Sequence, residues 1–527
     1  MSSLVAVLAA ATGTSARIVI PHIDYGAILP ELILLGGVLV LIGLSAMTSR
    51  RPPTGVFAAA TVGIAVAALV ASLRLWRRVQ DHGAFTTIAH SVDVDGFAVY
   101  FLVLVSAVLV VAAILGAGYL RREGIEGCEY YALALISGSG AMFMASANDL
   151  ILVFLALEVL SIPLYVLAGF DRRRATSQEA AIKYFVLGAF SSAVFVYGIA
   201  LVYGATGSTN LPEIAAFLAH NVITANGVLL AGIALIIVGF SFKVAAVPFH
   251  MWTPDVYQGA PTPVTGFMAA IAKAGGFAAF LRVFVATFPT LRGDWQPVIW
   301  ALAAVTLLGG AVVALVQRDV KRMLAYSSIN HAGFVLIGLQ AATTRGVAAG
   351  AYYVFAYAFI VLGSFAVVGV VGGKGDRRHD LEAYRGLATH NPVLATTFTV
   401  LLLAQAGVPF TTGFFAKFYV LEASVGAHSY ALAVIAMASA AIAVFFYLRV
   451  VRLMFATQPA PTPDGPPVPA EPPAGGVATL VRPVAERLAV SPSIALGLTI
   501  CLGVTVVFGV WPQPLIDFAR AATLLFH

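Results

Sequence analysis

The feature that most constrains this chain is a series of about fourteen apolar segments, each near the length that crosses a bilayer. A membrane-spanning helix needs about 20 apolar residues. Segments of this kind occur at 28–47, 54–73, 96–119, 129–146, 149–170, 179–204, 227–249, 262–288, 297–317, 321–340, 347–372, 391–425, 428–455 and 493–515. Only 10% of the residues are charged, against roughly 25% in soluble proteins. We therefore predict an all-α polytopic membrane protein with about fourteen transmembrane helices.

The loops between the segments are mostly short, and basic residues distinguish their two sides. Cytoplasmic loops carry an excess of Lys and Arg. With the N-terminus outside, 18 of the 30 Lys and Arg residues fall in inside loops and 7 in outside loops or termini. We therefore expect both termini outside, with Phe85 to His90 and Leu211 to His220 on the outer side. The positive net charge follows from this asymmetry and does not indicate a nucleic-acid partner.

One loop is unlike the others. Gln458–Pro473 contains 8 prolines in 16 residues. Such a composition favours an extended, solvated chain. We expect this linker to lie within a cytoplasmic loop that spans 456–491.

Five cations remain within the apolar segments: Lys183, Lys243, Lys273, Arg282 and Lys417. A charge at the bilayer centre costs at least roughly 2.5 kcal/mol on insertion scales. Four of the six lysines are in this group, whereas the loops use arginine almost exclusively. Lysine can lose its proton when it is desolvated, and arginine cannot. The lysines are therefore either paired structural ions or groups that exchange protons; for Arg282 we expect a side chain that reaches the outer interface.

Glu158 lies in the middle of an apolar segment and is the one acidic residue deep within such a span. A carboxylate beside a lysine influences whether that lysine holds its proton. We expect a lysine such as Lys183 to be its partner, either as a structural counter-ion or as part of a proton-transfer pair. Glu31 and Glu422 lie nearer to segment ends and are weaker candidates.

Two segments contain a proline close to a buried lysine. Pro248 follows Lys243 by five residues and frees the carbonyl of Val244, while Pro409 precedes Lys417 by eight and frees that of Gln405. In lipid, such freed carbonyls need partners. Broken helices in two halves of a chain are typical of inverted-repeat transporters.

Two histidines are further candidates for proton transfer, because histidine titrates near neutral pH. His250 follows the first proline break, and His331 follows Ser327, Ser328 and Asn330 in a polar stripe. The alternative for each is a structural residue whose ring nitrogens are hydrogen-bonded. The sequence has no nucleotide-binding motif and no Cys or His cluster with metal or iron–sulfur spacing. We therefore expect no cofactor and no metal in this chain, and free thiols at Cys128 and Cys501.

Several stretches resemble one known family. They are the segment from Phe242 that includes VPFHMWTPDVYQGAPTPVTGFMAAIAKAGGF (242–277), EAAIKYFVLGAFSSA (179–193), RDVKRMLAYSSINHAGF (318–334) and VPFTTGFFAKFYVL (408–421). Together they are similar to the N subunits of NADH–quinone oxidoreductases, the respiratory complex I. The WTPDVYQGAP form resembles the N subunits rather than their M and L relatives. The similarity covers residues 145–425.

The resemblance implies an organisation and a set of site residues. It implies three N-terminal helices (1–125), two inverted five-helix repeats (126–290 and 291–455) that each hold a broken helix, the proline-rich loop (456–491) and a last helix (492–527). It implies that Trp252 to Pro263 is a rigid loop that closes the core. The residues that match the family's proton-carrying positions are Glu158, Lys183, Lys243, Lys273 and Lys417.

The predicted function is that of a proton-translocating membrane-arm subunit. On this resemblance its partners are the M-type and K-type subunits and the lipid of a bacterial inner (plasma) membrane. NADH, flavin, iron–sulfur clusters and quinone would belong to partner subunits. One alternative is a subunit of a related multi-subunit cation/proton antiporter; a second is a structural scaffold, for which apolar replacement of the buried lysines would be harmless.

Overall fold

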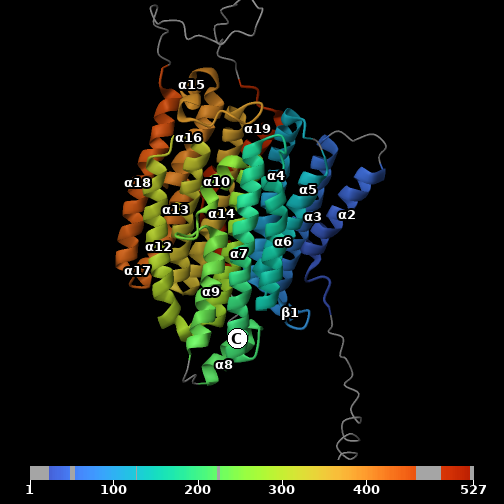
Figure 1. Ribbon diagram of the computed structural model, residues 1–527, viewed down its shortest axis with the longest axis vertical. Coiled ribbons are helices and arrows are strands. Elements are labelled where there is room, and N and C mark those ends of the chain that lie inside the picture. The colour runs from blue at the N-terminus through green and yellow to red at the C-terminus, as the bar shows by residue number, and fades with distance from the viewer. Residues whose placement is uncertain (1–22, 48–53, 126, 222–225, 458–487, 523–527) are drawn as a thin grey trace, which may run out of the picture.

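The computed structural model describes residues 23–47, 54–125, 127–221, 226–457 and 488–522 as a bundle of helices that run side by side along the long axis of the molecule (Figure 1). Within these residues, eleven helices are long and apolar enough to cross a membrane. The α-helices of the bundle are α2 (Leu29–Met47), α3 (Thr54–His82), α4 (Gly96–Glu123), α5 (Glu129–Ser146), α6 (Leu150–Ala168), α7 (Ala175–Thr206), α9 (Gly227–Val244), α10 (Trp252–Gly259), α11 (Thr262–Arg282), α12 (Arg292–Leu315), α13 (Val320–Ala341), α14 (Thr344–Gly372), α16 (Pro392–Ala406), α17 (Thr412–Gly426), α18 (Tyr430–Phe455) and α19 (Pro492–Val510).

Each of the fourteen predicted segments coincides with one helix of the bundle or with a broken pair, so the predicted all-α membrane fold is confirmed. Aspartates start several of these helices, because a carboxylate accepts a hydrogen bond from a free amide of the first turn. Asp95, Asp149 and Asp319 do so for α4, α6 and α13. The proline-rich linker and most of the 456–491 loop lie outside the described residues.

The two predicted helix breaks are present, with their prolines in turns rather than inside helices. α9 ends at Val244, Ala245 takes the left-handed conformation (φ 63°), and Pro248 lies in the turn before α10. At this break the carbonyl of Phe242, and not that of Val244 as expected, accepts a hydrogen bond from Trp252 Nε1 at 3.0 Å. The expectation of a loop from Trp252 to Pro263 is therefore wrong over most of its length, because Trp252–Gly259 forms the helix α10.

The second break separates α16 from α17. α16 ends at Ala406, Gly407 has a φ of 89°, and Pro409 lies in the turn before Thr412. This left-handed position favours glycine, since a Cβ would clash with the backbone. The predicted single segment 391–425 is thus two shorter helices.

One face of the bundle, which we call the hairpin face, carries the antiparallel strands β1 (Phe85–Thr87) and β2 (Val92–Val94) and the short helices α8 (Leu211–His220) and α20 (Gln513–Ala521). The first and last described segments both lie here: the Asp24 amide donates to Thr87 Oγ1 at 3.0 Å, and the Ala521 carbonyl packs on Gly96. The predicted outside loops share this face. Which face is outside stays a prediction.

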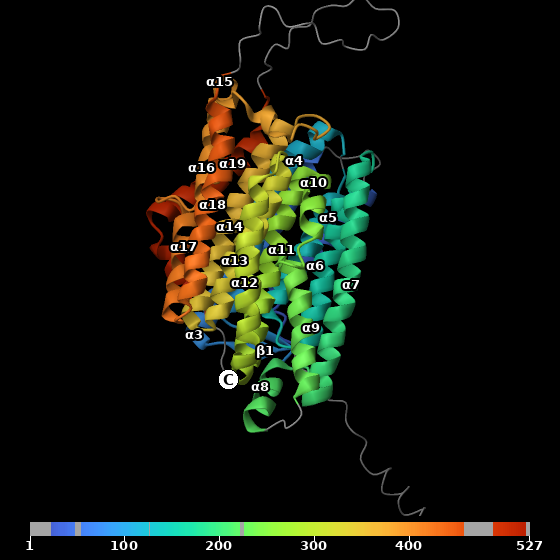
Figure 2. The same ribbon diagram turned by 60° about the vertical axis from the view of Figure 1, so that its left-hand side comes forward.

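The opposite face, which we call the arginine face, carries α15 (Leu387–His390) and the Arg-rich loops (Figure 1). Its loops are joined by ion pairs such as Arg174 with Asp376 at 3.0 Å. Among the eleven helices that could cross a membrane, α11 and α14 are the most buried. Figure 2 shows α11 behind α12 and α9, near the middle of the molecule. The helix that carries Lys273 therefore occupies the centre of the fold.

Candidate functional site

Lys243 lies in the last turn of α9, directly before the first helix break. Its side chain is buried, and Nζ donates to Ser161 Oγ on α6 at 2.8 Å. Ser161 in turn donates to the carbonyl of Leu157. The C-terminal end of a helix carries partial negative charge and favours a cation. The break thus gives Lys243 a site that can hold it in its charged form without a direct ion pair.

Glu158 is half-buried on α6 and accepts a hydrogen bond from Ser192 on α7. It lies three residues before Ser161, so both side chains share one face of α6. A small cleft between α6, α7 and α9 is lined by Ser161, Ser192 and Lys243. The Glu158 carboxylate is also close enough to Lys243 to interact with it electrostatically. The structure therefore brings Glu158 and Lys243 together, with serines between them.

Lys183 does not join this pair, so the expected pairing of Glu158 with Lys183 is wrong. Lys183 Nζ binds Glu179 Oε1 at 2.7 Å and Asp255 Oδ2 at 2.9 Å, and its side chain is 42% exposed. Lys183 precedes Ser192 by nine residues, which places it about 13 Å along α7 from the residue that contacts Glu158. It lines a polar cavity of about 590 Å³ on the arginine face.

Lys273 occupies the middle of α11 and is buried. Its Nζ donates to the carbonyl oxygen of Ser328 on α13. Ser328 Oγ accepts from the Tyr357 hydroxyl of α14 at 2.7 Å. Nζ also lies 5.2 Å from the centre of the Tyr357 ring. A desolvated lysine with neutral partners is suited to exchange its proton.

His331 lies on α13, one turn beyond Ser327, within a buried polar cluster. Its Nδ1 is 2.7 Å from the Tyr353 hydroxyl and its Nε2 is 3.3 Å from the Tyr447 hydroxyl. Tyr447 also contacts Ser327. Because both ring nitrogens have hydroxyl partners, His331 can pass a proton between them.

Gln405, the next-to-last residue of α16, extends this cluster. Its Oε1 accepts from Ser327 at 3.0 Å and its Nε2 donates to Ser364 at 2.8 Å. The sequence reasoning missed Tyr353, Tyr447, Ser364 and the side chain of Gln405. No sequence pattern distinguishes these side chains from other polar residues of apolar helices.

Lys417 lies on α17 and reaches back across the second break. Its Nζ donates to the carbonyl of Ala406, the last residue of α16, at 2.8 Å. The break therefore exposes this carbonyl to the lysine, rather than that of Gln405 as predicted. Nζ also lies 5.0 Å from the centre of the Phe334 ring of α13. Lys417 is buried next to the polar cluster of His331 and Gln405.

Three other basic residues have different surroundings. His250 is half-buried in the turn before α10, and its Nδ1 has no hydrogen-bond partner among the described residues. Arg282 is 2% exposed and forms ion pairs with Asp93 and Asp95, so the expectation that it reaches the outer interface is wrong. Lys321, counted as an inside-loop cation, is fully buried and donates to the Ala260 carbonyl at 2.7 Å.

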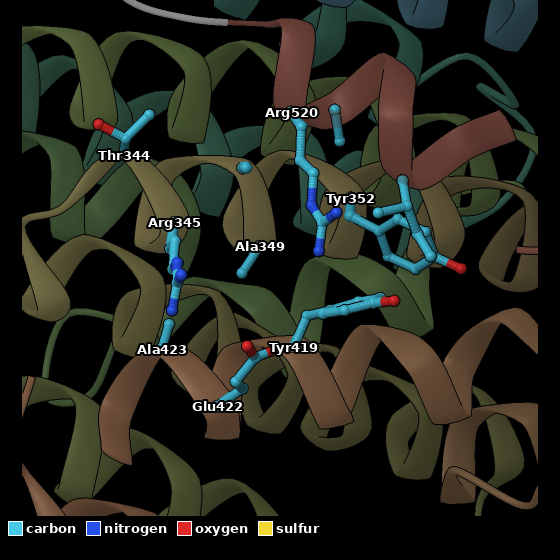
Figure 3. A pocket seen from close by; sticks show the side chains of 11 residues that line it. Thr344, Arg345, Ala349, Tyr352, Tyr419, Glu422, Ala423 and Arg520 are labelled. Atoms are coloured by element: carbon cyan, nitrogen blue, oxygen red, sulfur yellow. The ribbon is translucent and has the colours of Figure 1, made fainter. Parts of the chain in front are cut away.

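The weaker acidic candidates lie away from the lysines. Glu31 is buried near the start of α2, and its Oε2 has no partner in the described part of the chain. Glu422 lines a pocket of about 360 Å³ between α14, α17 and α20 (Figure 3). Arg345 and Arg520 line the same pocket. Glu422 therefore belongs to the hairpin face and not to the buried cluster.

Comparison with known proteins identifies the family of this chain. Residues 147–443 match the family model described as the transmembrane NADH:quinone oxidoreductase/Mrp antiporter family. The NADH-quinone oxidoreductase subunit N of Parafrankia sp. (strain EAN1pec) is 40% identical over 543 residues, which cover 99% of each chain. The chain belongs to the NADH-quinone oxidoreductase subunit N family. A subunit N of Streptomyces griseus is 49% identical over 358 residues, 66% of this chain and 64% of that one.

Chains of known structure have a fold similar to that of this subunit N family member. A chain of the respiratory complex I from Thermus thermophilus with bound aureothin has a TM-score of 0.74 at 31% identity, and covers 93% of this chain and 98% of that one. A chain of the Mrp complex from Dietzia sp. DQ12-45-1b has a TM-score of 0.80 at 21% identity, and covers 94% and 96%. The second likeness shows the fold alone.

Proposed function

We propose that this chain is a proton-translocating membrane-arm subunit of an NADH-quinone oxidoreductase. The observation that carries the proposal is the series of titratable side chains across the middle of the bundle, four of them buried and Glu158 half-buried: Glu158, Lys243, Lys273, His331 and Lys417. Each of them has a hydroxyl group or a backbone carbonyl as its hydrogen-bond partner. Buried ionisable residues in a membrane protein mark ion or proton paths. Family membership supplies the reaction that drives the path.

Protons would move laterally along this series. Glu158 and Lys243 form one end, since the charge of the carboxylate influences the proton affinity of the lysine. Lys273 is the central group, and the cluster of His331, Tyr447 and Gln405 leads toward Lys417. Lys183 and His250 are proposed as accessory groups. Lys183 lines the open cavity on the arginine face and is suited to the supply of protons from that side.

The remaining parts of the proposal follow from the family and, for the orientation, from the distribution of basic residues between the loops. The N- and C-terminal ends and the hairpin face lie outside a bacterial inner membrane, and M-type and K-type subunits flank this chain. NADH, flavin, iron–sulfur clusters and quinone are held by partner subunits, and quinone reduction there drives the proton movement. This chain supplies the path and no redox centre.

Purification of the tagged chain in mild detergent tests the assignment. We expect it to co-migrate with NADH-oxidising subunits and with NADH-driven quinone reduction. The likeness of fold to the Mrp complex makes a cation/proton antiporter the second candidate. A chain that purifies without NADH-oxidising subunits and exchanges sodium for protons in vesicles would overturn the assignment in favour of that candidate.

A further inference from the structure

The buried Arg282 at the hairpin-face end of α11 has no part in the series of lysines. Its Nη1 binds Asp93 Oδ2 at 2.8 Å and its Nη2 binds Asp95 Oδ1 at 2.7 Å. Its Nε donates to the carbonyl of Ala145 at the end of α5 at 2.9 Å. The arginine and both aspartates are each at most 3% exposed. This cluster joins the β2 strand, the start of α4, α5 and α11.

The cluster has one carboxylate too many for its cation. Two aspartates and one arginine leave a net charge of −1 in a buried site, which is costly unless a proton or a cation neutralises it. Asp95 also caps α4 by accepting from the Ala98 amide at 2.6 Å. The second carboxyl oxygen of Asp93, Oδ1, is buried and has no hydrogen-bond partner among the described residues.

Among the described residues, Arg282 is the cation that pairs with Asp93. Arg282 and Asp95 are the charged groups that act on it most strongly. The neighbouring strand places the neutral Thr86 opposite, and α5 contributes the neutral Ala145 carbonyl. Other titratable side chains near this end of the bundle have partners of their own: His90 contacts Thr86, Asp149 accepts from Thr209, and Arg78 at the hairpin pairs with Asp24.

We propose that Asp93 is a proton-binding site of the resting protein, with the proton on the vacant Oδ1 of its carboxyl group. Protonation leaves Arg282 paired with ionised Asp95, and the cluster becomes neutral. Burial raises the pKa of Asp93 most, Arg282 opposes this, and the charge of Asp95 adds to it, so that the pKa rises to about 7. The site can therefore load and release a proton near neutral pH.

The position of the site gives it a role in proton release. Arg282 follows Lys273 by nine residues, about 13 Å along α11. The eight residues between them, 274–281, are Ala, Gly, Phe and Leu and are all buried. Asp93 is thus separated from the lysine series and lies at the hairpin face. Its role as a release group rests on the proposed function, whereas its protonation does not.

Infrared spectroscopy of the assembled complex tests the protonation. We expect a C=O stretching band of a protonated carboxyl group at pH 6 that weakens as the pH rises through about 7 and is absent in Asp93→Asn. Asp93→Asn should assemble normally, because asparagine resembles the neutral carboxyl. The matched control Asp95→Asn should assemble poorly, because it removes the charge that balances Arg282.

Two results would overturn the site. One is an identical set of carboxyl bands in wild type and Asp93→Asn. The other is an Asp93→Asn subunit that fails to assemble, since this would show that the charge at Asp93 is required. The release role has a separate readout, the number of protons moved per NADH, which we expect to fall in Asp93→Asn. Loss of the band with unchanged proton movement would contradict release while the proton-binding site stands.

Discussion

Lys417 on α17 donates a hydrogen bond to the carbonyl oxygen of Ala406, the last residue of α16, at 2.8 Å. The lysine thus satisfies a carbonyl that the helix break would otherwise leave without a partner in an apolar environment. Lys243 has a comparable position at the end of α9, although it contacts the Ser161 hydroxyl instead. At both breaks, a titratable cation lies at the negative end of a helix.

Lys417→Met should leave the subunit assembled and lower coupled turnover. Methionine keeps most of the volume and removes the titratable amine. The freed Ala406 carbonyl should cost about 1–3 kcal/mol of stability, which a large membrane bundle tolerates. NADH-driven quinone reduction and proton movement by the assembled complex measure the effect. Normal proton movement in that variant would remove Lys417 from the path.

Glu158→Gln and Lys243→Ala should each reduce quinone-linked activity and proton movement roughly tenfold or more, since loss of a proton-transfer group commonly costs 10²–10⁴ in rate. Lys243 lines the cleft between α6, α7 and α9, and Glu158 accepts a hydrogen bond from Ser192 of the same cleft, so the two residues should act as a unit. The double variant should then be little worse than the worse single variant. Fully additive losses would show that the two residues work independently.

Lys183→Met should affect proton movement less than Lys243→Ala. Lys183 is partly exposed and has two carboxylate partners, Glu179 and Asp255. Asp255 keeps a second cation, Arg322, at 2.7 Å, so the cavity remains charged after the replacement. Proton uptake rates compared across the two variants measure the difference. A loss for Lys183→Met as large as that for Lys243→Ala would place Lys183 on the main path.

The buried Asp376 should make the subunit sensitive to acid. Burial alone would raise the pKa of Asp376, but Lys321, His379 and Thr262 hold it well below its ordinary value of 3.8. A lowered folded-state pKa contributes stability at pH values above the unfolded pKa, and this stability is lost as the pH falls below about 4. Asp376→Asn should lower stability by on the order of 3 kcal/mol at pH 7.

Thermal unfolding of the assembled complex between pH 3 and pH 7 measures the contribution of Asp376. The variant should lose less stability than wild type on acidification, because the group that titrates is gone. The exposed Asp294 provides a matched control: Asp294→Asn should keep the wild-type pH dependence. Equal acid sensitivity in all three proteins would contradict the assigned role of Asp376.

Single cysteines test the topology. Cys128 and Cys501 are both buried, so labelling of the natural thiols should be slight. Cysteines placed within Phe85 to His90 or within Leu211 to His220 should react with a membrane-impermeant reagent in intact cells. A cysteine in the 456–491 loop should react only after the cells are opened. The reverse labelling pattern would show that the predicted orientation is wrong.

The sequence predicts the helices well, because about 20 apolar residues in a row have few alternatives to crossing a membrane. It also predicts which lysines are buried, since Lys243, Lys273 and Lys417 stand alone in apolar runs. The partner of a residue on another helix is harder to predict, because it depends on how far along its own helix each residue lies. Lys183 shows this: it was expected beside Glu158, but its partners are Glu179 of its own helix and Asp255 of α10.

The predicted solvent exposure of Arg282 and Lys321 was wrong for a related reason. Both lie near helix ends, where an apolar pattern cannot distinguish a solvated side chain from one that a folded loop covers. Asp93 and Asp95 reach Arg282 through the hairpin, and Asp376 reaches Lys321 from the loop after α14. These contacts join residues more than 50 positions apart, and no local pattern reports them.

The most direct measurement of the central claim is the number of protons moved per NADH by assembled complex that carries Lys273→Met. Lys273 is the middle group of the buried series and contacts Ser328. The exposed loop residue Lys374 is the matched control. We predict a clear fall for Lys273→Met and a wild-type value for Lys374→Met. A wild-type value for both, at normal assembly, would contradict the proposal that protons cross this subunit along its buried lysines.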